Sequence, residues 1–189
     1  MKKVVCVLGS PIANGNSETI ARKFLEMAES LGAVAETFFL HDLCFSGCHA
    51  CMGCKTGSEE CVVEDDLAPV LRAVRAADVL VMTSPIYFGQ VTGQLKCFMD
   101  RTYSFLKPNY MTDPSPSRLS PGKKCVFILT QGNPNEKDYD VFPVYEGFLK
   151  WFGYETHSIR GLGMAAATAA VERQDLLKKA DDLAKQVIG

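Results

Sequence analysis

The 189-residue sequence lacks both an excess of basic residues and long apolar runs. Twenty Lys and Arg stand against 22 Asp and Glu, so the formal charge is −2. Binding to nucleic acid or to an anionic membrane surface depends on a basic excess, and we therefore predict neither partner. No apolar run approaches the ~20 residues of a membrane-spanning helix.

A secretion signal is also missing from the amino-terminal segment. Its apolar part is only six residues long and runs directly into a Gly/Asn loop, which favours a first β-strand. We accordingly expect a cytoplasmic protein in a reducing compartment, where its eight cysteines do not form a disulfide framework.

Cysteines are instead concentrated in one short segment. Four of them fall within 14 residues, with the spacing C-x2-C-x2-C-x6-C, on a loop from about 44 to 62. Four thiolates on a tight loop can point at one centre, as zinc and iron–sulfur clusters both require. The residues leave three alternatives open: a cluster, zinc, or free redox-reactive thiols. The predicted metal ligands are Cys48, Cys51, Cys54 and Cys61.

The other four cysteines have different settings. Cys6, Cys97 and Cys125 lie among apolar residues and are expected to be buried structural thiols. Cys44 precedes the cluster by four residues and is either a spare ligand or a packed side chain.

Strand and helix patterns alternate along the chain. Continuous apolar runs closed by turn residues predict strands, and apolar residues at helical spacing predict the helices between them. The alternation predicts one α/β domain, residues 1–189, with a parallel sheet covered on both faces. The predicted strands are 4–8, 34–40, 78–83, 124–130 and 154–159. The predicted helices are 17–31, 66–77, 90–106, 139–152 and 172–187, and the proline-rich stretch 107–122 is a predicted loop.

The loop after the first predicted strand, Gly9 to Ser17, is rich in small and amide residues. Ligands of such sheets bind at the carboxyl ends of the strands, where backbone N–H groups and the start of a helix can hold a phosphate. No Lys or Arg occurs from Val4 to Ala21, so a phosphate would be held without ion pairs. The alternative is an ordinary turn with a serine helix cap. The side-chain donors available are Ser10, Asn14, Asn16 and Ser17.

The loop after the third predicted strand carries two aromatic residues, a proline and a glycine. Tyr87 and Phe88 suit a flat apolar ligand, and Gly89 allows close backbone approach. A phosphate at one loop and a flat ring at the next describe flavin mononucleotide (FMN). The alternative is a loop that covers the sheet end or a subunit contact. The expected opposite wall, after the fourth strand, is Thr130, Gln131 and Gly132.

Three motifs together resemble the flavodoxin-like NAD(P)H-dependent FMN reductases. They are G-S-P-x-x-x-G-N-S from Gly9, S-P-I-Y-F-G from Ser84, and L-K-x-F-M-D-R from Leu95. The cysteine loop, followed by C-V-V-E-D-D-L from Cys61, resembles a subgroup, the iron–sulfur flavoproteins of anaerobes. The resemblance runs from Met1 to about Leu106.

This resemblance implies a doubly wound sheet of five parallel strands in the order 2-1-3-4-5, with FMN where the strand order reverses. It also implies NAD(P)H as co-substrate and a homodimer or homotetramer whose interface borders the flavin. Ile12 stands where the family often has Arg, so one phosphate ion pair is missing. By position, Ser10, Asn16 and Ser17 would hold the phosphate, and Pro85, Ile86, Tyr87, Phe88 and Gly89 would face the isoalloxazine ring.

In the subgroup, the four cysteines bind a 4Fe-4S cluster that exchanges electrons with FMN. Three hypotheses about function therefore stay open. The first is an FMN-dependent oxidoreductase that moves electrons between NAD(P)H and a flavin, quinone or protein acceptor. The second is an iron–sulfur flavoprotein that acts as a ferredoxin-coupled carrier, and the third is a non-enzymatic flavodoxin-type module. Because FMN carries the redox chemistry itself, we predict no catalytic side chain.

Overall fold

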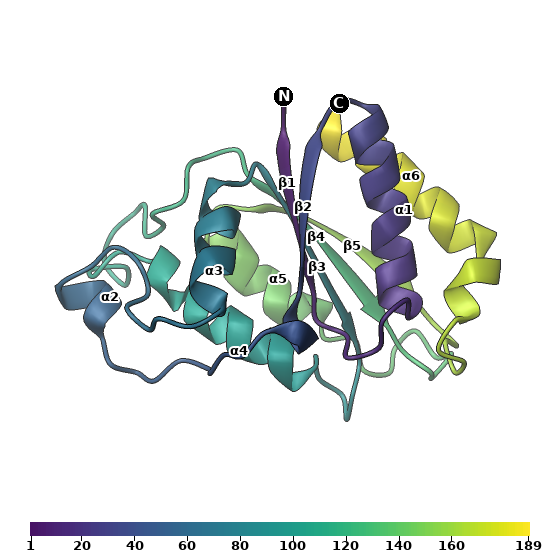
Figure 1. Ribbon diagram of the computed structural model, residues 1–189, viewed down its shortest axis with the longest axis horizontal. Helices are drawn as coiled ribbons and strands as arrows, with labels where there is room; N and C mark the ends of the chain where they lie inside the picture. Colours follow the sequence, from purple (N-terminus) through teal and green to yellow (C-terminus); the bar gives the residue numbers. More distant parts are fainter.

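A five-stranded sheet lies between two layers of helices in the computed structural model, which describes residues 1–189 (Figure 1). All neighbouring strands run parallel, in the order β2-β1-β3-β4-β5. This confirms the predicted flavodoxin-like fold and its strand order. The strands are β1 (Lys3–Leu8), β2 (Val34–Phe39), β3 (Val79–Pro85), β4 (Lys124–Thr130) and β5 (Glu155–Gly161).

Helices cover both faces of this sheet. α1 (Asn16–Ser30) and α6 (Gln174–Ile188) pack side by side on one face (Figure 1). The other face carries α3 (Leu67–Ala76), α4 (Gly93–Arg101) and α5 (Phe142–Trp151). None of the helices has the length and apolar character that crossing a membrane requires. The short helices are α2 (Gly53–Thr56), η1 (Leu40–Asp42), η2 (Thr102–Phe105) and η3 (Ala169–Glu172).

The central strands β1, β3 and β4 each contribute to two separate cores, because successive side chains point to opposite faces. Val5 and Val7 of β1 belong to the core beneath α3, α4 and α5. Val4, Cys6 and Leu8 belong to the core beneath α1 and α6. Burial on both faces explains why β1, β3 and β4 are largely apolar in sequence, whereas the edge strands β2 and β5 carry polar residues.

The cysteines outside the dense segment follow their predicted settings in part. Cys6 and Cys125 are buried, and burial raises the pKa of both thiols well above the ordinary value. Cys97 is only half-buried, which differs from the expectation, because it faces the cysteine loop at Gly47 rather than the core. Cys44 is exposed.

Several element boundaries differ from the sequence-based ones. The helix predicted from residue 90 begins at Gly93, because Thr92 caps it by accepting a hydrogen bond from Leu95 N. It ends at Arg101 and continues as the 3-10 turn η2. The helix predicted from residue 139 begins only at Phe142. The short helix α2 inside the cysteine loop was not predicted.

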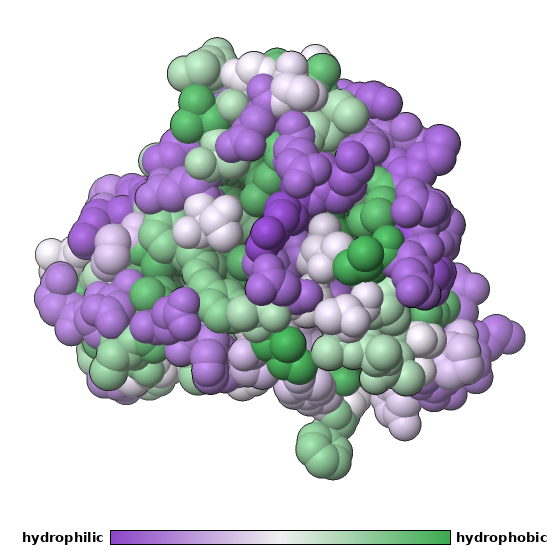
Figure 2. Space-filling view, turned by 45° about the vertical axis from the view of Figure 1, so that its right-hand side comes forward, coloured by the Kyte–Doolittle hydropathy of each residue, from purple (hydrophilic) through white to green (hydrophobic).

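The two termini lie together at the upper edge of the sheet in Figure 1, and the loops after the strands lie at the lower edge. Lys2 Nζ donates a hydrogen bond to the carbonyl of Val187 at 2.9 Å, which joins the two ends of the chain. Figure 2 shows polar and apolar residues interspersed over the visible face of the molecule.

Gly9 sits where β1 passes into the loop at the lower edge. Its N–H donates to the carbonyl of Thr83, and its carbonyl accepts from Thr92 Oγ1 at 2.6 Å. A Cβ at this position would lie 2.6 Å from Thr83 O and 2.8 Å from Leu95 Cβ. Only glycine fits between β3 and α4 without moving them.

We therefore expect Gly9→Ala to lower the free energy of unfolding by about 2 kcal/mol, the usual cost of overpacking. Urea unfolding followed by circular dichroism measures it. Gly93→Ala is the matched control, since a Cβ there meets nothing within 4 Å and alanine favours a helix. Equal stability of the two variants would contradict the close contact at Gly9.

Candidate functional site

The loops after β1, β3, β4 and β5 surround a cavity of about 230 Å³ at the carboxyl edge of the sheet. Ten of the residues singled out from the sequence line it. Met164, Ala165 and Ala167 of the loop after β5 line it as well and were not predicted. The sequence could have indicated these three residues only by their place after the fifth predicted strand, because parallel strands end at the same edge of the sheet. The ten are Ser10, Ile12, Asn16, Ser17, Pro85, Ile86, Tyr87, Thr130, Gln131 and Gly132.

One end of the cavity is formed by the start of α1. The N-cap residue is Gly15, and no side chain caps the helix. This goes against the alternative of an ordinary turn with a serine cap, since Ser17 is buried inside the first turn instead. Ser10 Oγ accepts from Ile12 N at 3.1 Å and so fixes the loop. An uncapped helix start leaves N–H groups and a partial positive charge for an anion.

The two asparagines of this loop have different environments. Asn16 is buried and bridges to the far wall: its Nδ2 donates to Ala166 O at 2.7 Å, and its Oδ1 accepts from Ala170 N at 2.8 Å. Asn14 does not line the cavity and accepts a hydrogen bond from Arg22. Asn16 thus holds two walls of the cavity together.

The wall after β4 is held by a similar network. Ile86 N donates to the carbonyl of Thr130, which ties the loop after β3 to the end of β4. Gln131 Nε2 lies within hydrogen-bonding distance of three backbone carbonyls, including those of Asn133 and Asp138. Its Oε1 accepts from Arg160 Nη2 at 3.2 Å. These hydrogen bonds tie the loops at this edge to one another.

Phe88 and Gly89 lie outside this cavity, at the tip of a tight turn. Tyr87 N donates to Gln90 O at 2.8 Å, and Gln90 N donates to Tyr87 O at 3.0 Å. The φ angles of Phe88 and Gly89 are 50° and 75°, as in a type I′ turn. Both residues line an adjoining cavity with Tyr139, which shares Ile86, Gln131 and Gly132 with the first. The ring of Phe88 is fully exposed to solvent.

Asparagine is favoured over phenylalanine in such a turn, because a left-handed backbone costs a bulky residue about 1–2 kcal/mol. We therefore expect Phe88→Asn to raise the free energy of unfolding by about 1 kcal/mol. Thermal denaturation measures the change. Phe88→Ala removes the same ring but keeps the unfavourable backbone, and it should give no gain. A gain of equal size in both variants would assign the effect to the exposed ring instead.

The cysteine loop forms a second site. All four predicted ligands line one cavity of about 250 Å³, together with His49, Arg101 and Tyr103. The thiols are all unpaired, and no three His, Cys, Asp or Glu side chains are grouped as a single metal ion would require. This cavity shares no residue with the one at the sheet edge. His49 Nε2 lies 2.8 Å from Ser46 Oγ.

Arg101, at the end of α4, anchors the two ends of the cysteine loop. Its side chain is fully buried and pairs with Asp65 at 2.5 Å, and it also donates to the carbonyls of Ser46 and Val63. Burial acts to lower the pKa of Arg101, but Asp65 and Cys61 together outweigh it and raise the pKa above its ordinary value. Arg101 is the last residue of the L-K-x-F-M-D-R motif from Leu95, but its contacts with the cysteine loop were not predicted from the sequence.

Two further cations hold the middle of the loop. Lys55 Nζ donates to the carbonyls of Tyr103 and Leu106 at 2.6 and 2.7 Å, and it lies 4.0 Å from the centre of the Tyr103 ring. Burial lowers the pKa of Lys55 below its ordinary value. Arg118 Nη1 donates to the carbonyl of Cys54 at 2.9 Å.

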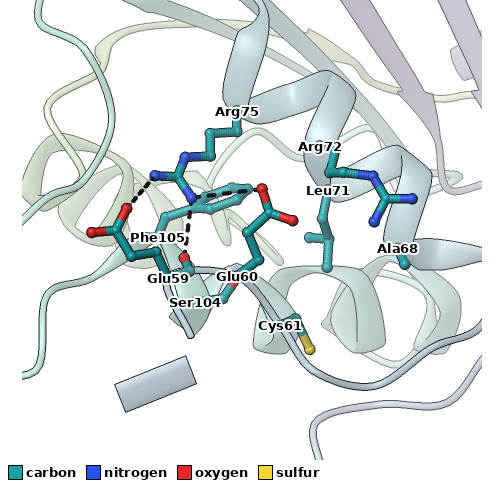
Figure 3. Close-up of a pocket in the computed structure, with 9 residues that line it drawn as sticks. All are labelled: Glu59, Glu60, Cys61, Ala68, Leu71, Arg72, Arg75, Ser104 and Phe105. Carbon is teal, nitrogen blue, oxygen red and sulfur yellow. Dashed lines mark hydrogen bonds and ion pairs between the residues drawn. The ribbon is translucent and has the colours of Figure 1, made fainter. Parts of the chain in front are cut away.

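The segment just before Cys61, the fourth predicted ligand, is bonded to α3 through Arg75. Figure 3 shows Arg75 reaching Glu59 and Glu60, while the sulfur of Cys61 points away from these carboxylates. The Arg75 nitrogens lie 3.2 Å from Glu59 Oε2 and 3.9 Å from Glu60 Oε1. The two carboxylates beside Cys61 thus have a cationic partner outside the cysteine cavity.

The sheet order defines a flavodoxin-like protein, and the first cavity lies at the strand ends, where sheets of this class bind their ligands. Within this class, the chain belongs to the NADPH-dependent FMN reductase family, whose sequence profile matches residues 2–138.

Two iron–sulfur flavoproteins are relatives that match a little over half of this chain. The chain is 32% identical over 108 residues to an iron–sulfur flavoprotein from Methanosarcina thermophila, which covers 57% of this chain and 56% of the relative. It is 35% identical over 100 residues to an iron–sulfur flavoprotein from Methanocaldococcus jannaschii, with coverage of 53% and 51%. The matched region spans about half the length of these relatives.

Solved structures are similar in fold. An FMN-dependent NADH-azoreductase from Bacillus anthracis, in complex with FMN, matches with a TM-score of 0.76 and 17% identity over the whole of both chains. An NAD(P)H:quinone oxidoreductase from Methanothermobacter marburgensis gives a TM-score of 0.74 and 16% identity, covering 100% of this chain and 98% of the other. At these identities the likeness concerns the fold.

Proposed function

We propose that the protein is an FMN-dependent oxidoreductase that transfers electrons between NAD(P)H and a flavin, quinone or protein acceptor. The observation that carries this proposal is the cavity at the strand ends, which has an uncapped helix start at one end and Tyr87 at another. Membership of the FMN reductase family supports FMN as the ligand.

The chain's own residues bind and orient the cofactor in this proposal. The phosphate is held by backbone N–H groups at the start of α1 and by the hydroxyls of Ser10 and Ser17. It has no ion pair at position 12, because Ile12 is uncharged. The segments 85–87 and 130–132 border the isoalloxazine ring. Bound FMN supplies transfer of a hydride or of single electrons. The adjoining cavity beside Phe88 and Tyr139 leaves room for the second substrate.

The second candidate function is an iron–sulfur flavoprotein, favoured by one observation: four thiols line a common cavity. Zinc binds sulfur at about 2.3 Å, so four thiolates around one ion lie close together. A cavity of about 250 Å³ is far larger than the ~10–15 Å³ that a single water needs on the same measure, and it has room for a group larger than one ion. We therefore favour a 4Fe-4S cluster over zinc. A ferredoxin partner, a homodimer or homotetramer and a cytoplasmic location remain predictions.

The test is purification of the full chain without oxygen, followed by three measurements. Flavin released on heating, iron and acid-labile sulfide are each determined per chain, and NADH and NADPH oxidation is followed with a quinone and with free flavin. The proposal expects one FMN per chain and turnover with at least one acceptor. Bound FMN without any turnover would favour the flavodoxin-type module, and a chain that takes up no FMN would overturn the proposal.

A further inference from the structure

Arg101 carries an unused hydrogen-bond donor in the wall of the cysteine cavity. Its side chain has 0% exposure, and its two terminal nitrogens are bonded to Asp65, Ser46 and Val63. The third nitrogen, Nε, is buried and has no partner. Buried donors in folded proteins are nearly always satisfied, so an unpaired guanidinium N–H in a cavity wall is available to a water or to a group bound in that cavity.

The charges around this cavity point to the kind of group. Arg101 comes from α4, Lys55 from α2 and Arg118 from the loop 107–122, and each is bonded to the walls of the cysteine site. Asp65 is the only carboxylate bonded to any of these three cations. The side chains that surround the site therefore carry a net positive charge, which favours an anionic occupant.

The nearby carboxylates do not change this balance. Glu59 and Glu60 are adjacent in sequence to Cys61, but both lie near Arg75, on the side away from the sulfur (Figure 3). Arg75 does not line the cysteine cavity. Glu59 and Glu60 are therefore paired with Arg75 and do not neutralise the three cations around the cysteine cavity.

We propose that Arg101 is a positioning residue that donates its free Nε–H to a sulfur of the cysteine-bound iron–sulfur cluster and makes the cluster easier to reduce. This inference rests on the second candidate function. A cluster held by four thiolates is anionic, and one added electron makes it more negative by one charge. A buried positive charge and a hydrogen bond to sulfur both stabilise the reduced form.

Redox titration of the anaerobically purified full chain, followed by electron paramagnetic resonance with dithionite as reductant, tests the proposal. Arg101→Gln should shift the one-electron reduction equilibrium at least tenfold toward the oxidised form, which is a potential lowered by 59 mV or more. Arg101→Lys keeps the charge but not the Nε–H, and it should give a smaller shift in the same direction. Arg75→Gln is the matched control and should titrate like the wild type.

The outcomes separate a tuning role from a merely structural one. A structural role would lower the iron content or the melting temperature of Arg101→Gln and leave the potential of the remaining cluster unchanged, which would overturn the proposal. If Arg101→Gln holds no iron, Arg101→Lys decides: a shifted potential supports the proposal, and an unshifted one overturns it. Wild-type protein without iron would overturn the cluster itself, whereas wild-type iron with unshifted variants overturns only the role of Arg101.

Discussion

Asn16→Asp is expected to lower the free energy of unfolding by about 3 kcal/mol at neutral pH. The amide of Asn16 donates to Ala166 O and accepts from Ala170 N, and the side chain is buried. A carboxylate keeps the second bond but faces the Ala166 carbonyl oxygen to oxygen. A buried donor is lost and a charge is left unpaired, which together cost this order of free energy.

The same substitution should weaken FMN binding by about 1–3 kcal/mol, because it adds a negative charge at the end of the cavity assigned to the phosphate. Binding is measured by quenching of flavin fluorescence on titration with the apoprotein. The loss of stability should shrink at low pH, since the introduced carboxyl group, once protonated, can donate to Ala166 O. Unfolding experiments at several pH values check this sign.

Asn135→Asp is the matched control for both measurements. Asn135 is exposed, and its Oδ1 only accepts a hydrogen bond, from Lys137 N at 3.1 Å. A carboxylate can make the same bond, so stability and FMN affinity should stay close to the wild type. If both variants behave alike, Asn16 does not hold the two walls together and the phosphate lies elsewhere.

Cys54→Ser should abolish binding of an iron–sulfur cluster and leave FMN binding intact. A serine hydroxyl is a poor substitute for a thiolate ligand, and loss of one of four ligands opens the site. The loop itself should survive, because Arg118 bonds the backbone carbonyl of Cys54 and not its side chain. FMN should be unaffected, because the two cavities share no residue.

Iron, sulfide and flavin per chain measure this prediction. Cys97→Ser is the control: Cys97 is also half-buried and lies against the cysteine loop at Gly47, but it does not line the cavity. It should keep the wild-type iron content. Full iron content in Cys54→Ser would remove Cys54 from the ligand set.

The sheet and its order could be predicted because their causes are local or general. Burial on both faces makes each central strand an apolar run, and the family resemblance then supplies the strand order. Helix starts were less predictable, because they depend on single hydrogen bonds. The helix expected from Gln90 starts later because Thr92 caps α4. The residues just before Thr92 form the tight turn that contains Phe88 and Gly89.

The loops that form the site could be predicted from the sequence, but the long-range contacts between their side chains could not. Ser10 and Tyr87 were found because they follow strands whose carboxyl ends meet at one edge. The partner of Asn16 lies 150 residues away, and Arg101 contacts a carbonyl 55 residues away. No local pattern encodes such pairs, so the roles of these two side chains emerged only from the folded chain.

The proximity of the two chain ends has a practical consequence. Both ends lie at the edge of the sheet opposite the first cavity, joined by the bond from Lys2 to Val187. A linker at either end that attaches the protein to an electrode would leave that cavity facing the solution. A short peptide that connects the two ends would allow new termini to be opened in a surface loop, such as the segment 107–122.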